Sequence, residues 1–199
     1  MVRRGHARAR SVAARALALT LPLATGPFVS CRQPARPPGP VEARLHLTLA
    51  PADFGMSVNV QQQVHVEAVG RTVDFDAVLD IAPEAVTLVG LSLGQRMLTL
   101  RYDGVTFTEQ RHPMLPAEVR GADILTDVQL SLWPAAAVQS ALPAGWVVRD
   151  DGTRRTLAQD GRDIVVITYE GASHWQGRLT LQNLRYNYRL VIRSVLTLP

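Results

Sequence analysis

From Met56 onward, polar and apolar residues alternate along several consecutive stretches, and this alternation limits what the chain can fold into. In residues 58–68, valines occupy one side of an extended strand while glutamine, histidine and glutamate occupy the other. A period of two residues is typical of β-strands with one buried face. The pattern returns in residues 73–81 and 98–102, with short turns between them. Consecutive strands joined in this way predict an antiparallel meander with one wet face.

The period changes in the middle of the chain. Between Ala122 and Trp133, apolar residues recur at helical spacing, and Asp123 and Asp127 occupy the other side. Pro134 ends this helix and can begin a second, which Pro143 ends. Strand patterns resume at residue 146, with a turn or bulge near residue 183. We therefore predict about ten strands, with two short helices inserted after the fifth.

The expected fold class is mainly β: an open antiparallel half-barrel covered by two or three short helices. A strongly curved sheet of this kind has one apolar face, and the helices supply a second apolar surface above it. The space between is either a packed core or a cavity for an apolar ligand, and periodicity does not separate the two. The residues expected to line a cavity are Val60, Val64, Phe75, Leu79, Leu98, Leu100, Ile124, Leu125, Val128, Leu132, Trp133, Trp146, Tyr186 and Tyr188.

The N-terminal segment has the composition of a secretory signal peptide. Residues 1–30 carry five arginines and no acid, followed by a short apolar run that Pro22 interrupts. That run is shorter than the roughly 20 residues of a spanning helix. Cys31, the single cysteine of the chain, follows the segment and precedes a proline-rich stretch that ends at residue 43. We expect a signal peptide over 1–30, a tether over 31–43 and one domain over 44–199.

Cys31 is predicted to be a lipidated N-terminus because it follows Val29 and Ser30, as in a bacterial lipobox. Leucine is usual three residues before such a cysteine, and this chain has Phe28 there. The alternative is an ordinary signal peptide that leaves a free thiol. No aspartate follows Cys31, which favours the periplasmic face of a Gram-negative outer membrane over retention in the inner membrane. Two acyl chains would anchor the domain durably.

The basic charge of the chain belongs largely to the signal segment. The sequence has 21 basic residues, all arginine, and 17 acidic ones, which gives a net charge of +4. Removing the five arginines of residues 1–30 leaves a net charge of −1. No arginine-dense run remains, so nucleic acid is not an expected partner.

Short motifs that could carry chemistry have simpler explanations here. Residues 90–94 read G-L-S-L-G, the pattern of a serine nucleophile elbow, but a strand pattern follows where that elbow needs a helix. We interpret the segment as a hairpin loop that exposes Leu91 and Leu93. His65 and Glu67 share a strand face without a third metal ligand, so we expect no metal site. No catalytic residue and no cofactor is predicted.

Three segments resemble a family of uncharacterised LolB-like lipoproteins that often accompanies aryl-polyene and related fatty-acid gene clusters. They read GQRMLTLRYDG in 94–104, DVQLSLWP in 127–134 and WQGRLTLQNLRY in 175–186. More broadly, the order of elements from about Val58 to Val195 resembles the outer-membrane lipoprotein receptor LolB and the periplasmic carrier LolA. Those proteins are open half-barrels whose hydrophobic hollow is covered by helices.

The resemblance implies a lid over Ile124–Trp133 and a membrane-contacting leucine at Leu93, with Leu91 beside it. It implies a non-enzymatic, monomeric outer-membrane lipoprotein that binds an acyl or lipid cargo and assists its transfer, with a periplasmic LolA-like carrier as a partner. The helical insert differs from that of LolB, which favours a different acyl cargo. The alternative is a structural or assembly partner of an envelope complex, with a filled core.

Overall fold

The computed structural model describes residues 44–68 and 70–197. The predictions that concern Cys31, the signal segment and the tether lie outside these residues. The described residues belong to one compact unit, Ala43–Pro199. Within them, no helix combines the length and the apolar composition that crossing a membrane requires.

Ten strands form a single sheet in which every neighbouring pair is antiparallel. Their bounds are β1 Val58–Ala68, β2 Arg71–Ala82, β3 Ala85–Ser92, β4 Gln95–Tyr102, β5 Phe107–Arg111, β6 Trp146–Asp150, β7 Arg154–Gln159, β8 Arg162–Ser173, β9 Gln176–Asn183 and β10 Tyr188–Leu196. The predicted break near residue 183 is the turn between β9 and β10.

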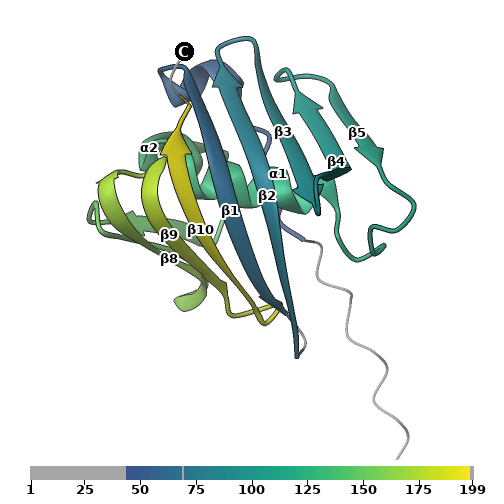
Figure 1. Cartoon of the computed structure of the whole chain (residues 1–199). Coiled ribbons are helices and arrows are strands. Elements are labelled where there is room, and N and C mark those ends of the chain that lie inside the picture. Colours follow the sequence, from purple (N-terminus) through teal and green to yellow (C-terminus); the bar gives the residue numbers. More distant parts are fainter. Residues whose placement is uncertain (1–43, 69, 198–199) are drawn as a thin grey trace, which may run out of the picture. The chain divides into compact units, whose positions relative to one another are not determined.

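The strand order is β5-β4-β3-β2-β1-β10-β9-β8-β7-β6, so the first and last strands pair at the centre of the sheet. The sheet curves into an open half-barrel (Figure 1), and β5 and β6 are its two edge strands. Irregular register at Gly90/Leu91, Leu157/Ala158 and Glu170/Ser173 adds local bends. The predicted fold class is therefore confirmed.

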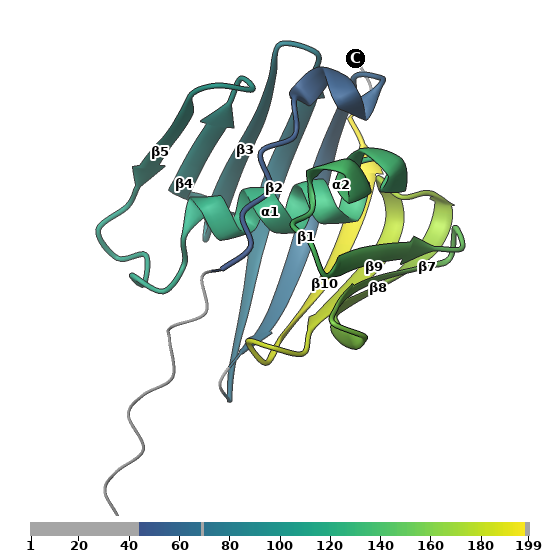
Figure 2. The same ribbon diagram turned by 180° about the vertical axis from the view of Figure 1, so that it is seen from behind.

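Helices α1, Gly121–Leu132, and α2, Ala135–Ala141, follow β5, and α1 begins and ends within one residue of its predicted bounds. Pro134 separates them, as predicted. Helix α1 crosses the concave face of the sheet, and α2 lies beside it toward β6 (Figure 2). A short 3-10 helix, η1, spans Pro51–Phe54 before β1.

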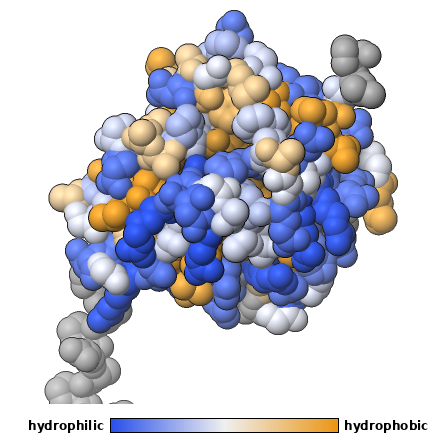
Figure 3. Space-filling view, turned by 90° about the vertical axis from the view of Figure 1, so that its left-hand side faces the viewer, coloured by the Kyte–Doolittle hydropathy of each residue, from blue (hydrophilic) through white to orange (hydrophobic). Residues whose placement is uncertain are grey.

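The hydrophobic core lies between the concave face and α1. In β1, alternate side chains from Val58 to Val64 are buried while those between them are exposed. The residues expected to share the inner face of β2 and β4, such as Leu79 and Leu100, are also buried. Figure 3 shows hydrophilic side chains across the centre and lower part of the side that carries β8 and β9, with hydrophobic side chains nearer its top. The prediction that one face of the sheet is buried and the other is exposed to solvent therefore holds for these strands.

Candidate functional site

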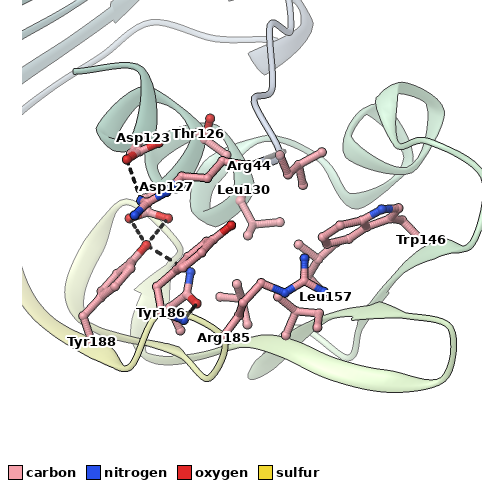
Figure 4. A pocket seen from close by; sticks show the side chains of 14 residues that line it. Arg44, Asp123, Thr126, Asp127, Leu130, Trp146, Leu157, Arg185, Tyr186 and Tyr188 are labelled. Carbon is pink, nitrogen blue, oxygen red and sulfur yellow. Dashed lines mark hydrogen bonds and ion pairs between the residues drawn. The ribbon is translucent and has the colours of Figure 1, made fainter. Parts of the chain in front are cut away.

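A small cavity lies between α1, the extended segment before η1, and the strands of the C-terminal half of the sheet (Figure 4). Its volume is about 40 Å³. On this measure one water molecule needs at least about 10–15 Å³, so the cavity holds a few waters. Its wall is lined by Arg44, Leu45, Asp123, Thr126, Asp127, Leu130, Trp146, Leu157, Ile164, Val165, Asn183, Arg185, Tyr186 and Tyr188.

The segment from Arg44 to Ala50 is held along α1 by side chains of the helix. The Gln129 side chain accepts a hydrogen bond from the Leu49 N–H at 3.1 Å and donates one to the Leu49 carbonyl at 2.8 Å. The Thr126 hydroxyl accepts from the Leu47 N–H at 3.2 Å. Residues 44–50 are not part of the sheet, so these polar side chains satisfy backbone groups that burial would otherwise leave unpaired.

The C-terminal end of α1 is fixed by a buried arginine from β7. Arg155 is 1% exposed, and its Nη1 donates to the carbonyl oxygens of Leu130 at 2.6 Å and Trp133 at 2.8 Å. Asp150 of β6 balances its charge through bonds of 2.6 Å. The Tyr169 hydroxyl donates to the Ser131 carbonyl at 2.8 Å. These groups satisfy the carbonyls that a helix end leaves free, and the cation lies at the negative end of the helix dipole.

Asp127 forms a hydrogen-bonded chain with two residues of the sheet at the cavity wall. The Tyr188 hydroxyl lies 2.7 Å from one carboxylate oxygen of Asp127 and 3.0 Å from the other. The Asn183 amide in turn donates to the Tyr188 oxygen at 3.2 Å. Burial raises the pKa of the Asp127 carboxyl to about 7, against the lowering effect of the Tyr188 hydrogen bond. Burial, together with the Asp127 charge, raises the pKa of Tyr188.

Two arginines border the cavity, each stacked on an aromatic ring. The Arg44 guanidinium lies 4.1 Å from the ring centre of Tyr186 and donates to Asp123 at 2.7 Å. The Arg185 guanidinium lies 5.1 Å from the ring centre of Trp146 and donates to Gln159. Figure 4 shows Asp127, Tyr186 and Tyr188 on one side of the cavity and Trp146 on the other. The site thus joins an apolar wall to a cationic and ionisable border.

The structure brings together only part of the set expected to line a cavity. Trp146, Tyr186 and Tyr188 line it. Ile124 and Val128 are half-buried against the core, and Val64 and Phe75 border a separate surface depression. The remaining residues are packed in the core and contribute no cavity surface; they are Val60, Leu79, Leu98, Leu100, Leu125, Leu132 and Trp133. Periodicity identified the buried face correctly and could not locate the space left within it.

Sequence reasoning missed the polar members of the cavity wall. It assigned Asp123 and Asp127 only to the side of α1 away from the apolar residues, and in the structure that side faces the cavity and the segment 44–50. It assigned no role to Arg44 or Arg185. The sequence offered no local signal for these contacts, because Arg44 stacks on Tyr186 and Arg185 stacks on Trp146, and both partners are distant in the chain.

The G-L-S-L-G segment is part of a β-hairpin, as interpreted, but the loop is shorter than predicted. Residues 90–92 belong to β3 and pair with β2 or β4, so the turn consists of Leu93 and Gly94. Leu91 is consequently half-buried in the strand, and the prediction that it is exposed in a loop is wrong. Leu93 is fully exposed, at 104%, with φ 51°. The strand β4 follows the turn, so the helix that a nucleophile elbow requires does not occur here.

His65 takes part in an exposed polar cluster on the convex face. Its Nδ1 lies 2.6 Å from Asp74 and its Nε2 lies 3.5 Å from Glu67. In the described part of the chain, no three histidine, cysteine or acidic residues are grouped as a metal site would require.

Residues 59–196 match the sequence profile of a family described as a protein of unknown function, DUF3261. The chain belongs to this family. No curated protein matches it. Among solved structures, a LolA superfamily protein from Nitrosomonas europaea is similar at 10% identity and a TM-score of 0.43, over 76% of this chain and 92% of that one. A DUF1329 family protein from Desulfovibrio piger ATCC 29098 is similar at 10% identity and a TM-score of 0.32, over 73% of this chain and 87% of that one.

Proposed function

We propose that this protein is a non-catalytic lipid-binding protein of the bacterial envelope. It takes an acyl or similar hydrophobic chain between α1 and the concave face of the sheet and helps to place that chain in a membrane. In this proposal Cys31 is the lipidated N-terminus, the residues before Arg44 form the tether, and the domain faces the periplasm from the outer membrane. A soluble LolA-like carrier would be its partner in transfer.

The observation that carries the proposal is the composition of the cavity wall. Leu130 and Leu157 contribute apolar surface, while Arg44, Asp127 and Arg185 lie at the border. A site with this division fits an amphiphile whose apolar chain enters the wall and whose polar end stays at the border. Each buried methylene contributes roughly 0.8 kcal/mol, so a long chain needs few polar contacts.

A cavity of about 40 Å³ is too small for an acyl chain, so loading requires movement of its cover. The N-terminal half of α1 and the segment 44–50 form that cover. Asp123 and its partners Arg44 and Arg120 hold the helix start through contacts of 2.7 and 2.9 Å, and the arginines are more than one-third exposed. Exposed pairs of this kind contribute about 0–1 kcal/mol each. Opening at this end of α1 therefore costs less than opening at the buried Arg155.

Leu93 supports a role at a lipid surface. Both residues of its turn have positive φ, a conformation that favours glycine, asparagine or aspartate at both positions. Neither the preference of the turn nor burial in the fold therefore explains a leucine at this fully exposed position. In the proposal its side chain enters lipid or a partner during transfer.

The packed core favours a second candidate, a structural or assembly partner in an envelope complex. Val60, Leu79 and Trp133 have no exposed surface, so most of the predicted hollow is filled by the protein itself. In that case the small cavity is a packing defect with no cargo. The two candidates differ in whether lipid accompanies the purified protein.

The test is mass spectrometry of lipids extracted from the protein after export and purification without its anchor. We expect a bound acyl lipid in the natural protein. Val165→Phe would fill the cavity from β8, and Val166→Phe adds the same volume on the opposite face of that strand as a matched control. The first variant should lose the lipid and the second should keep it. An empty natural protein that co-purifies with defined envelope proteins would support the second candidate and overturn the first.

A further inference from the structure

The antiparallel order places the turns of the sheet alternately at two ends. The turns β1–β2, β3–β4, β7–β8 and β9–β10 and the loop from β5 to α1 share one end. The turns β2–β3, β4–β5, β6–β7 and β8–β9 share the other, together with η1, which contacts β2 and β3. Figure 1 shows the β1–β2 and β9–β10 turns at the lower end of the molecule. Residues far apart in the sequence are therefore gathered at each end.

The first end is basic. Its turns and the two strand residues on either side of each carry Arg71, Arg96, Arg111, Arg120, Arg162, Arg185 and Arg189, against Glu67, Glu118, Asp160 and Asp163, which gives a net charge of +3. All of these arginines except the half-buried Arg185 and Arg189 are exposed. We call this set of turns the basic end.

The opposite end is acidic. Its turns and the two strand residues on either side of each carry Asp53 of η1, Glu84, Asp103, Asp150 and Asp151, against Arg101, Arg149, Arg154 and the buried Arg155, which gives a net charge of −1. Backbone hydrogen bonds from Thr106 and Val105 lower the pKa of Asp103, so its charge persists well below neutral pH. The hydroxyl and the N–H of Thr153 do the same for Asp151. The two ends of the domain thus differ in sign.

Turn chemistry explains the acidic end and leaves the basic end unexplained. Aspartate is common in turns because its carboxylate accepts nearby backbone N–H groups, as Asp103 does from Val105 and Thr106 at 3.0 and 2.7 Å. Arginine has no such role in a turn. Apolar side chains are exposed at both ends, with Leu93 at the basic end and Val105 at the acidic end, so charge is what distinguishes the two.

The described chain also begins at the basic end. The guanidinium of Arg44 stacks on Tyr186 in the β9–β10 turn. Cys31 precedes Arg44 by thirteen residues, which span at most about 45 Å when fully extended. An anchor at Cys31 would therefore join the domain close to its basic end.

From the gathered arginines, the exposed Leu93 and the position of Arg44, we infer that the basic end docks on an anionic lipid surface. Arginine side chains near such a surface each contribute about 1 kcal/mol, and the attraction fades beyond the Debye length of about 8 Å. The acidic end then points away from the lipid. This docking does not depend on whether the cavity under α1 binds a cargo.

The test is co-sedimentation with lipid vesicles of the chain beginning at residue 32, which keeps the whole compact unit and lacks the anchor. We expect binding to vesicles of phosphatidylcholine mixed with phosphatidylglycerol, little binding to pure phosphatidylcholine, and loss of binding at high salt. The double variant Arg71→Gln/Arg96→Gln should weaken binding about thirtyfold, or about fivefold for each arginine. The control Arg101→Gln/Arg154→Gln removes the same charge from exposed residues at or near the acidic end and should change binding far less.

Three outcomes would overturn the inference. One is equal binding to charged and uncharged vesicles, which would assign the contact to apolar insertion alone. Another is an equal loss in both double variants, which would assign it to net charge without orientation. The third is no binding to either type of vesicle, which would indicate that the basic end contacts a protein partner and not lipid. Circular dichroism of both double variants checks that they remain folded.

Discussion

Helix α1 is held by a buried arginine at one end and by exposed ion pairs at the other. At the C-terminal end, Arg155 and Tyr169 reach three carbonyl oxygens of the last helical turn and the residue after it. At the N-terminal end, Arg120 occupies the cap position without a side-chain cap, and Asp123 meets Arg44 and Arg120 near the surface. Charged groups hold both ends of α1, but only the C-terminal end keeps its cation, Arg155, away from water.

The difference in burial decides which end can open. A buried ion pair that loses one partner leaves an uncompensated charge, which is strongly destabilising. An exposed pair is readily replaced by water and salt. We therefore expect the N-terminal end of α1 to open before its Trp133–Pro134 end, and each prediction below tests one part of that asymmetry.

The largest loss of stability is expected at the buried, C-terminal end of α1. Arg155→Met removes three hydrogen bonds and leaves the half-buried Asp150 without its cationic partner. We expect the free energy of unfolding to fall by about 3–5 kcal/mol, measured by urea denaturation. The neighbouring Arg154 is exposed, so Arg154→Met is a matched control that should change stability by less than about 0.5 kcal/mol. Equal effects of the two substitutions would show that Arg155 does not fix the helix end.

The sequence was sufficient to predict the fold because its signals are local. The alternation in β1 and the helix-ending Pro134 each act over a few residues, and the structure places the elements accordingly. The pairing of β1 with β10 joins the two ends of the domain, and alternation alone did not specify it. No prediction from the sequence placed β1 beside β10.

The candidate site was less predictable because it depends on contacts between distant residues. Arg155 follows a polar turn and reads as a solvated strand residue, yet it reaches a helix more than 20 positions earlier in the chain. Asp127 reads as a polar residue of α1 and meets Tyr188 across 61 positions. Amphipathic patterns report which face is buried, and they do not report which polar group has a partner there.

A smaller effect is expected in the middle of α1, at Asp127. Its pKa is about 7 in the folded protein and near 3.9 in an unfolded chain, so the folded state binds the proton more tightly. Its contribution to stability is therefore full below about pH 4 and is lost as the pH rises toward and through 7. Asp127→Asn should remove this dependence and should be the more stable form at pH 8. Urea denaturation across this pH range measures the difference.

The hydroxyl of Tyr188 offers a second way to examine the same group. Its hydrogen bond lowers the pKa of Asp127, so Tyr188→Phe should move the loss of stability to higher pH. An unchanged pH profile in both variants would show that the Asp127 carboxyl is hydrated in solution. In that case the middle of α1 would resemble its exposed end more than its buried one.

The smallest effect on stability is expected at the exposed end, and it distinguishes a helix that opens from one that is fixed throughout. Asp123→Ala removes the partner of Arg44 and Arg120, which should cost less than about 1 kcal/mol and still less at high salt. Hydrogen exchange should nevertheless accelerate at the Leu47 and Leu49 amides, because they bond to the side chains of Thr126 and Gln129 on α1. Exchange at the Trp133 amide, near the buried Arg155, should stay slow. Uniform acceleration along α1 would mean that the helix detaches as one unit and that its two ends are not functionally different.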